Sequence, residues 1–147
     1  MTFHSKTFFK HSFLATLLAA SSLASVAHAT TLTSKLSGEA ETPPVTTMGT
    51  GVVDASYKPE TKVLKWKATY SGLSGPVTAG HFHGPAAPGQ AAGVALPLKG
   101  KLDSPIEGEA TLTDAQAAEL LAGKWYFNLH TAANPKGEVR GQVVVSP

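Results

Sequence analysis

Apolar and polar residues alternate in short runs along most of the chain after residue 30, which predicts β-strands. The clearest run, residues 62–70, puts Leu64 and Trp66 on one face and Lys65 and Lys67 on the other. Gly, Pro and Asn residues separate the runs and are typical of turns. The pattern predicts strands over residues 32–41, 51–57, 62–70, 76–84, 94–98, 106–112, 125–131 and 139–145.

These elements predict an all-β fold, a Greek-key-like two-sheet β-sandwich or flattened barrel of about seven to eight strands. The run 94–98 is short and contains Pro97, so we expect it at a sheet edge. One short helix is expected over residues 115–122, with Thr113 as its N-cap and Gly123 at its C-terminal end. We expect this helix to cover one end of the core.

Residues 1–29 have the pattern of a secretory signal peptide. Lys6 and Lys10 precede the apolar stretch 13–26, and residues 27–29, Ala-His-Ala, form a small-x-small cleavage motif before a mature start at Thr30. The apolar stretch is shorter than the ~20 residues of a membrane-spanning helix. We therefore predict a removed leader, 1–29, a single mature domain, 30–147, and a periplasmic or secreted location.

Composition narrows the possible functions. Removing the two lysines of the leader leaves ten basic and ten acidic residues, so no excess positive charge favours nucleic-acid binding. The chain has no cysteine, which excludes disulfides, thiolate ligands and a thiol nucleophile. No G-x-S-x-G sequence indicates a serine hydrolase. The acidic pairs Glu39 with Glu41 and Glu107 with Glu109 are expected to be solvated.

The histidines are the main candidates for chemistry, because only three of the six remain after the leader is removed. His81 and His83 form an H-x-H pair whose side chains share one face of a strand, with Phe82 on the other. His130 lies in the segment 125–131, whose apolar residues face the core and leave this histidine outside it. If the two strands are close, the three imidazoles converge on a surface cluster that can bind a metal.

The ligand types suggest which metal. Imidazoles without thiolates suit copper(II), zinc or nickel better than calcium or magnesium, and copper(II) heads the affinity order. Copper is therefore our first candidate and zinc the second. Met48 is the only methionine after the leader, which argues against a methionine-rich copper(I) carrier. The alternative is that each imidazole is simply hydrogen-bonded to backbone or to a carboxylate.

Four further residues are candidates to support this cluster: Asn128, Tyr126, Glu138 and Arg140. Asn128 shares a strand face with His130 and is placed to orient a ring or hold a water. Arg140 and Gln142 share a face of the last segment, so in a hairpin they lie across from Tyr126 and Asn128. Arg140 either guides an anion to the metal or, as we favour, pairs with Glu138 or another acid to fix the hairpin.

Several motifs resemble the CHRD domain, first recognised as repeats in chordin, an extracellular antagonist of bone morphogenetic proteins. The resemblance spans nearly all of residues 31–145 and rests on the stretches L-S-G-E at 36–39, G-H-F-H-G-P-A at 80–86, Y-F-N-L-H-T at 126–131 and N-P-K-G-E-V-R-G-Q at 134–142. It implies a secreted single-domain protein of a bacterial type. It implies no activity, because these domains are generally treated as having no known molecular function.

Two functional hypotheses of different classes follow. The first is an exported metal-binding module with His81, His83 and His130 as ligands and copper as the candidate ion. An open copper position also permits redox cycling, so weak oxidoreductase activity stays open, although no catalytic residue is assigned. The second is an extracellular protein-interaction or structural module without metal. A homodimer or an extracellular protein partner is compatible with either hypothesis.

Overall fold

A computed structural model describes residues 1–2 and 28–147 of the chain. Most of the predicted signal peptide, residues 3–27, lies outside the described residues, so the leader stays a prediction. Nine strands and one helix make up the described part. They are β1 Thr30–Ser37, β2 Thr50–Lys58, β3 Val63–Ser71, β4 Val77–His83, β5 Val94–Pro97, β6 Ile106–Thr111, α1 Asp114–Leu121, β7 Tyr126–Thr131, β8 Val139–Gln142 and β9 Val144–Val145.

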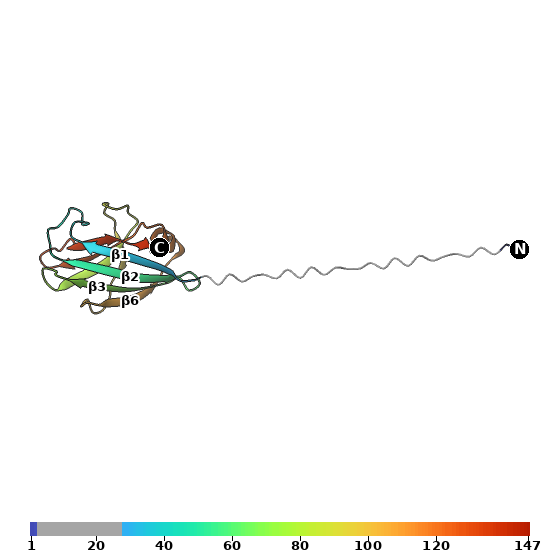
Figure 1. Ribbon diagram of the computed structural model, residues 1–147, viewed down its shortest axis with the longest axis horizontal. Helices are drawn as coiled ribbons and strands as arrows, with labels where there is room; N and C mark the ends of the chain where they lie inside the picture. Colours follow the sequence, from blue (N-terminus) through green and yellow to red (C-terminus); the bar gives the residue numbers. More distant parts are fainter. Residues whose placement is uncertain (3–27) are drawn as a thin grey trace.

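The strands form one antiparallel sheet in the order β5-β4-β7-β8-β1-β2-β3-β6, with β9 paired to β1. A single residue pair, Ser37 with Arg140, joins β1 to β8 in the middle of this order. Figure 1 shows β1, β2, β3 and β6 side by side in one half of the sheet. The predicted all-β fold with one short helix is confirmed, and β5 lies at a sheet edge as Pro97 predicted.

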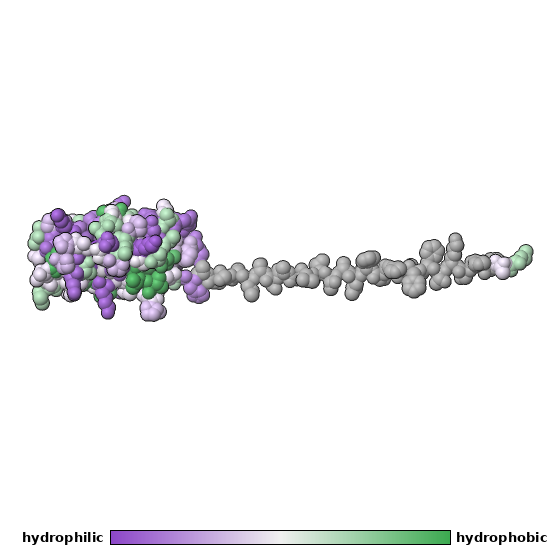
Figure 2. Space-filling view, turned by 90° about the horizontal axis from the view of Figure 1, so that it is seen from above, coloured by the Kyte–Doolittle hydropathy of each residue, from purple (hydrophilic) through white to green (hydrophobic). Residues whose placement is uncertain are grey.

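The sheet curls into a half-barrel, so that its two halves pack face to face. Trp66 from β3 meets Phe82 from β4 edge-on, with ring centroids 5.4 Å apart, although these strands are distant in the sheet order. Phe82 also contacts Phe127 of β7 at 5.0 Å. On the face seen in Figure 2 hydrophilic and hydrophobic residues are intermixed, with a compact hydrophobic cluster at the lower edge, whereas the large buried side chains belong to a single core. The large apolar side chains are therefore gathered between the two halves.

The helix α1, Asp114–Leu121, begins and ends one residue before the predicted range 115–122, and Thr113 is its N-cap as expected. Thr113 accepts a hydrogen bond from the Gln116 amide, and the Gln116 side chain accepts one from the Thr113 amide, which forms a capping box. Gly123 follows the helix with a φ of +69°, a conformation that glycine adopts without strain. Ala117 and Leu120 are buried in the core, so the helix covers part of it as expected.

Two predicted strands differ from the structure. The first ends at Ser37 rather than at residue 41, because Gly38 starts a turn in which its carbonyl accepts from the Glu41 amide. The last is divided at Val143, whose amide donates to the Trp125 carbonyl. As a result β8 pairs with β7, whereas β9 turns away and pairs with β1.

A buried carboxylate ties together four segments at one end of the half-barrel. Glu138, at the start of β8, is fully buried and accepts hydrogen bonds from Thr47, Ser74 and Thr131. The Ser74 amide and the three hydroxyls approach to between 2.5 and 2.8 Å. Burial alone raises the pKa of this carboxyl, but the hydrogen bonds outweigh it and lower the pKa to about 2.

We predict that Glu138→Gln lowers the free energy of unfolding at pH 7 by about 2 kcal/mol, because buried donors lose a charged acceptor. The depressed pKa also means that Glu138 stabilises the fold fully above pH 4.5 and progressively less as the pH falls toward about 2. Urea unfolding at several pH values measures both effects. The stability of the variant should change less with pH over this window, whereas the exposed control Glu109→Gln should retain the wild-type profile.

The packing of Trp66 gives a second prediction. A Cβ atom at Gly108, on the neighbouring strand β6, would overlap the indole ring of Trp66. We expect Gly108→Ala to destabilise the protein by about 1–3 kcal/mol, because the ring has to leave its place in the core. Gly75→Ala is the matched control, since a Cβ atom there meets nothing within 4 Å. Equal thermal stability of the two variants would contradict this role of Gly108.

Candidate metal centre

The three histidines lie on the outer face of neighbouring strands in one half of the sheet. His81 and His83 are on β4, and His130 is on β7, which pairs directly with β4. Phe82, between the first two, points into the core and is fully buried. The period of two along each strand therefore brings the imidazoles to the same face, as the sequence predicted.

This face is more enclosed than a surface cluster. All six residues of β7 are buried, and His83 and His130 are each only 9% exposed, while His81 is half-buried. The segment 84–93 lies against this face, because its carbonyls accept hydrogen bonds from side chains there. The expected cluster is therefore present on the non-core face, but two of its three rings are buried under loops and only His81 is half-buried.

His83 is fixed on several sides. Its Nδ1 is 3.0 Å from the carbonyl oxygen of Ala92, in the segment that covers the face. A carbonyl oxygen only accepts, so Nδ1 carries the proton and Nε2 of the neutral ring has a free lone pair. The ring also stacks on Tyr126 at a centroid distance of 4.8 Å and an interplanar angle of 4°. Both the plane and the tautomer of His83 are thus determined by its neighbours.

A main-chain carbonyl also fixes the ring of His130. Its Nδ1 is 3.1 Å from the carbonyl oxygen of Pro135, in the turn between β7 and β8. Its Nε2 therefore also presents a lone pair, and it lies 3.0 Å from Nδ1 of His81. A backbone carbonyl that fixes the distal nitrogen of an imidazole is the usual support of a metal-binding histidine.

One nitrogen from each ring lies within 4.8 Å of the other two. Two nitrogens that bind one zinc ion at ~2.0–2.1 Å are about 3.3 Å apart in tetrahedral geometry. The 3.0 Å separation between Nδ1 of His81 and Nε2 of His130 is already close to this, and His81 is the most exposed of the three rings. The three imidazoles can therefore hold a common ion after a small movement.

Burial favours the neutral form of two of the rings, His81 and His130. Burial lowers the pKa of His81, and the charges of His130 and His83 lower it further. Burial also lowers the pKa of His130, partly opposed by the hydrogen bond to Pro135 and assisted by His83. Neutral imidazoles are the form that binds metal ions, so the lowered pKa values of these two rings favour cation binding at neutral pH.

Asn128 lies at the centre of the cluster. Its Oδ1 is 3.1 Å from Nε2 of His83 and 3.1 Å from Nε2 of His130. Its amide group is hydrogen-bonded to the carboxylate of Glu41 on the other side. The sequence predicted that Asn128 shares this face, but it did not indicate Glu41.

Glu41 is a buried residue of the site, which corrects the expectation that it is solvated. The loop after β1 brings its carboxylate beside Gly137, with only 8% of the residue exposed. Burial raises the pKa of this carboxyl, while the charge of Arg140 and hydrogen bonds from Thr42 and Asn128 lower it. No local pattern could have identified Glu41, because it reaches the site through a long-range contact between loops.

Arg140 and Tyr126 support the cluster by stacking. The register pairs Asn128 with Arg140 and Tyr126 with Gln142, as the hairpin pattern predicted. The guanidinium carbon of Arg140 lies 3.4 Å from the centroid of the Tyr126 ring, and Tyr126 in turn stacks on His83. Arg140 donates hydrogen bonds to the Gln90 carbonyl at 2.7 Å and to the Thr42 hydroxyl at 3.3 Å.

Arg140 does not pair with Glu138, the first acid named from the sequence, but its charge does act on another acid, Glu41, and lowers the pKa of that carboxyl. Glu138 is satisfied by Thr47, Ser74 and Thr131. Its side chain therefore supports the fold at the end of the half-barrel and contacts none of the histidines in the described part of the chain.

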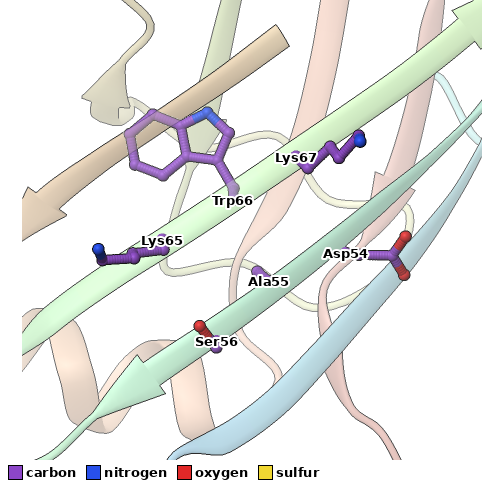
Figure 3. A pocket seen from close by; sticks show the side chains of 6 residues that line it. All are labelled: Asp54, Ala55, Ser56, Lys65, Trp66 and Lys67. Atoms are coloured by element: carbon purple, nitrogen blue, oxygen red, sulfur yellow. The ribbon is translucent and has the colours of Figure 1, made fainter. Parts of the chain in front are cut away.

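A hollow lies on the other half of the sheet, over β2 and β3. Figure 3 shows Lys65 and Lys67 on β3 beside Asp54 and Ser56 on β2. The lysines form exposed ion pairs with Glu109 at 3.0 Å and Glu107 at 3.5 Å. Exposed pairs of this kind contribute little to stability. Glu107 and Glu109 are exposed as predicted, and this hollow gathers no ligand set comparable to the histidines.

Comparison with known proteins gives a family but no functional parallel. Curated proteins and solved structures yield no match. No helix in the described residues is long and apolar enough to cross a membrane. The family model described as CHRD domain matches residues 32–143, which include every strand from β2 to β8, the helix and all three clustered histidines. The chain therefore belongs to the CHRD domain family, whose members occur in extracellular proteins.

Proposed function

We propose that the protein is an exported metal-binding module in which His81, His83 and His130 hold one divalent ion. Copper(II) is the first candidate for this ion and zinc is the second. The observation that carries the proposal is the pair of main-chain carbonyls, Ala92 and Pro135, that fix Nδ1 of two rings. Both rings are thereby forced to present Nε2 lone pairs toward the same small volume.

The alternative, in which each imidazole is only a structural hydrogen-bonding group, explains the two Nδ1 contacts and the contact between His81 and His130. It leaves the contacts of Asn128 Oδ1 with the two Nε2 atoms without a proton to share. Three further features favour a cation. The ligand nitrogens lie within 4.8 Å of one another, burial lowers the pKa values of His81 and His130, and a carboxylate, Glu41, is buried nearby.

Besides the small ring movement, binding requires the shift of one proton within the His81 ring. Without an ion, Nδ1 of His81 is placed to donate to Nε2 of His130 at 3.0 Å. For His81 to bind through Nδ1, the proton moves to its own Nε2 and the ring stays neutral. Metal binding to the neutral imidazoles therefore releases few protons. Acidification weakens binding, because protons compete with the ion for the same nitrogen lone pairs.

Copper(II) is the first ion to test because imidazole ligands without thiolates favour it and it heads the divalent affinity order. Zinc fits the same ligands with an open coordination position. Since the predicted leader directs the chain out of the cytoplasm, its role would be to bind or buffer the metal in the periplasm or outside the cell.

The test is metal uptake by the purified protein, without a histidine tag. We expect about one equivalent of copper(II) or zinc per chain at neutral pH. His83→Ala should lower the affinity by at least tenfold, because loss of a ligand leaves two imidazoles. Competition against a chelator of known affinity measures this loss. Asp54→Ala removes an exposed potential ligand outside the cluster and should leave the affinity unchanged.

Two results would count against the proposal. One is the absence of stoichiometric uptake at neutral pH. The other is an equal loss of affinity in His83→Ala and Asp54→Ala, which indicates adventitious binding. If no metal binds and a protein partner is recovered with the wild-type chain, the domain is a protein-interaction module with structural histidines.

A further inference from the structure

We propose that the side-chain oxygen of Asn128 is the fourth ligand of the metal, so that the centre has three nitrogen donors and one oxygen donor. This inference rests on the proposed metal-binding function and extends it from three residues to four. It assigns Asn128 a direct bond to the ion in place of the supporting role that the sequence suggested.

The first step concerns the atoms that surround Asn128 Oδ1. It lies 3.1 Å from Nε2 of both His83 and His130. Both nitrogens have free lone pairs, because the Nδ1 atoms of these rings face carbonyl oxygens. An amide oxygen also only accepts hydrogen bonds. Oδ1 and the two Nε2 atoms therefore face one another with no hydrogen between them. Without an ion only Nε2 of His130 has a donor, Nδ1 of His81, whereas a cation at this point is a partner for all three atoms.

The second step concerns the direction of the amide. The opposite orientation would point the NH₂ group at both Nε2 atoms and turn Oδ1 toward the carboxylate of Glu41. The NH₂ group instead hydrogen-bonds to Glu41, and Nδ2 lies next to Gly137 beside the same carboxylate. Repulsion between the amide oxygen and the carboxylate disfavours the opposite orientation. Glu41 is thus a positioning residue that directs Oδ1 at the ligand nitrogens.

The third step concerns burial. Asn128 is 3% exposed, and the two rings are 9% exposed, so water has little access to Oδ1. A buried acceptor without a partner costs roughly 1–3 kcal/mol. Native structures satisfy nearly all such groups, and an ion at this point would satisfy three of them together.

The fourth donor also limits the oxidation state of the ion. Amide oxygen is a hard ligand that suits divalent ions, whereas copper(I) prefers thiolate and thioether sulfur. The only methionine in residues 28–147 is Met48, which is exposed in the loop between β1 and β2. We therefore expect the centre to take copper(II) or zinc in preference to copper(I).

The experiment compares the wild type, Asn128→Leu, Asn128→Asp and the control Asn134→Asp. Copper(II) and zinc affinities are measured by chelator competition, and copper(II) electron paramagnetic resonance reports the donor set. Asn128→Leu should lose at least tenfold in affinity. Asn128→Asp should bind as tightly as the wild type or more tightly, because a carboxylate supplies the same oxygen with a negative charge. Asn134→Asp changes charge equally in the same hairpin and should leave the resonance spectrum unchanged.

A structure of the metal-loaded wild type makes the test independent of whether the variants fold. A distance of about 2.0–2.2 Å between Oδ1 and zinc supports the assignment, and a distance beyond 3 Å overturns it. Wild-type affinity and an unchanged spectrum in Asn128→Leu also overturn it while leaving the three-histidine site intact. No uptake by the wild type removes both proposals.

Discussion

The structure depends on β7 being buried on both of its faces. On one face Phe127 and Leu129 enter the core between the two halves of the half-barrel. On the other face Asn128 contacts Glu41 in the loop after β1, and His130 contacts Pro135 in the turn after β7 itself. A strand buried on both faces ordinarily has apolar residues throughout. Here one face carries polar groups, so each of these groups requires a specific partner.

The partners are mostly backbone carbonyls and aromatic faces, and this choice shapes the chemistry of the site. Ala92 and Pro135 accept from two imidazoles through their carbonyl oxygens, while Tyr126 lies between the guanidinium of Arg140 and the ring of His83. Such contacts fix orientation without adding charge next to the imidazoles. The nearest carboxylate, on Glu41, is separated from the rings by the amide of Asn128, which it helps to orient.

The sequence predicted those parts of the site that depend on strand periodicity. The H-x-H spacing placed His81 and His83 on one face, and the alternation in β7 placed His130 there as well. The hairpin pattern also predicted the register between Arg140 and Asn128. Loop contacts were not predictable, because they depend on segments distant in sequence whose path follows no period. The burial of Glu41, the covering of the rings and the hydrogen bonds of Glu138 all belong to this class.

The loop of residues 84–93 illustrates a constraint on how this fold can vary. Loops on protein surfaces ordinarily tolerate insertions well. In this loop, however, the Ala92 carbonyl holds both His83 and Tyr126, and the Gln90 carbonyl holds Arg140. An added residue would displace these oxygens from the side chains that they fix. The length of the loop is therefore set by imidazole geometry, and chain-length variation has to occur in other turns of the domain.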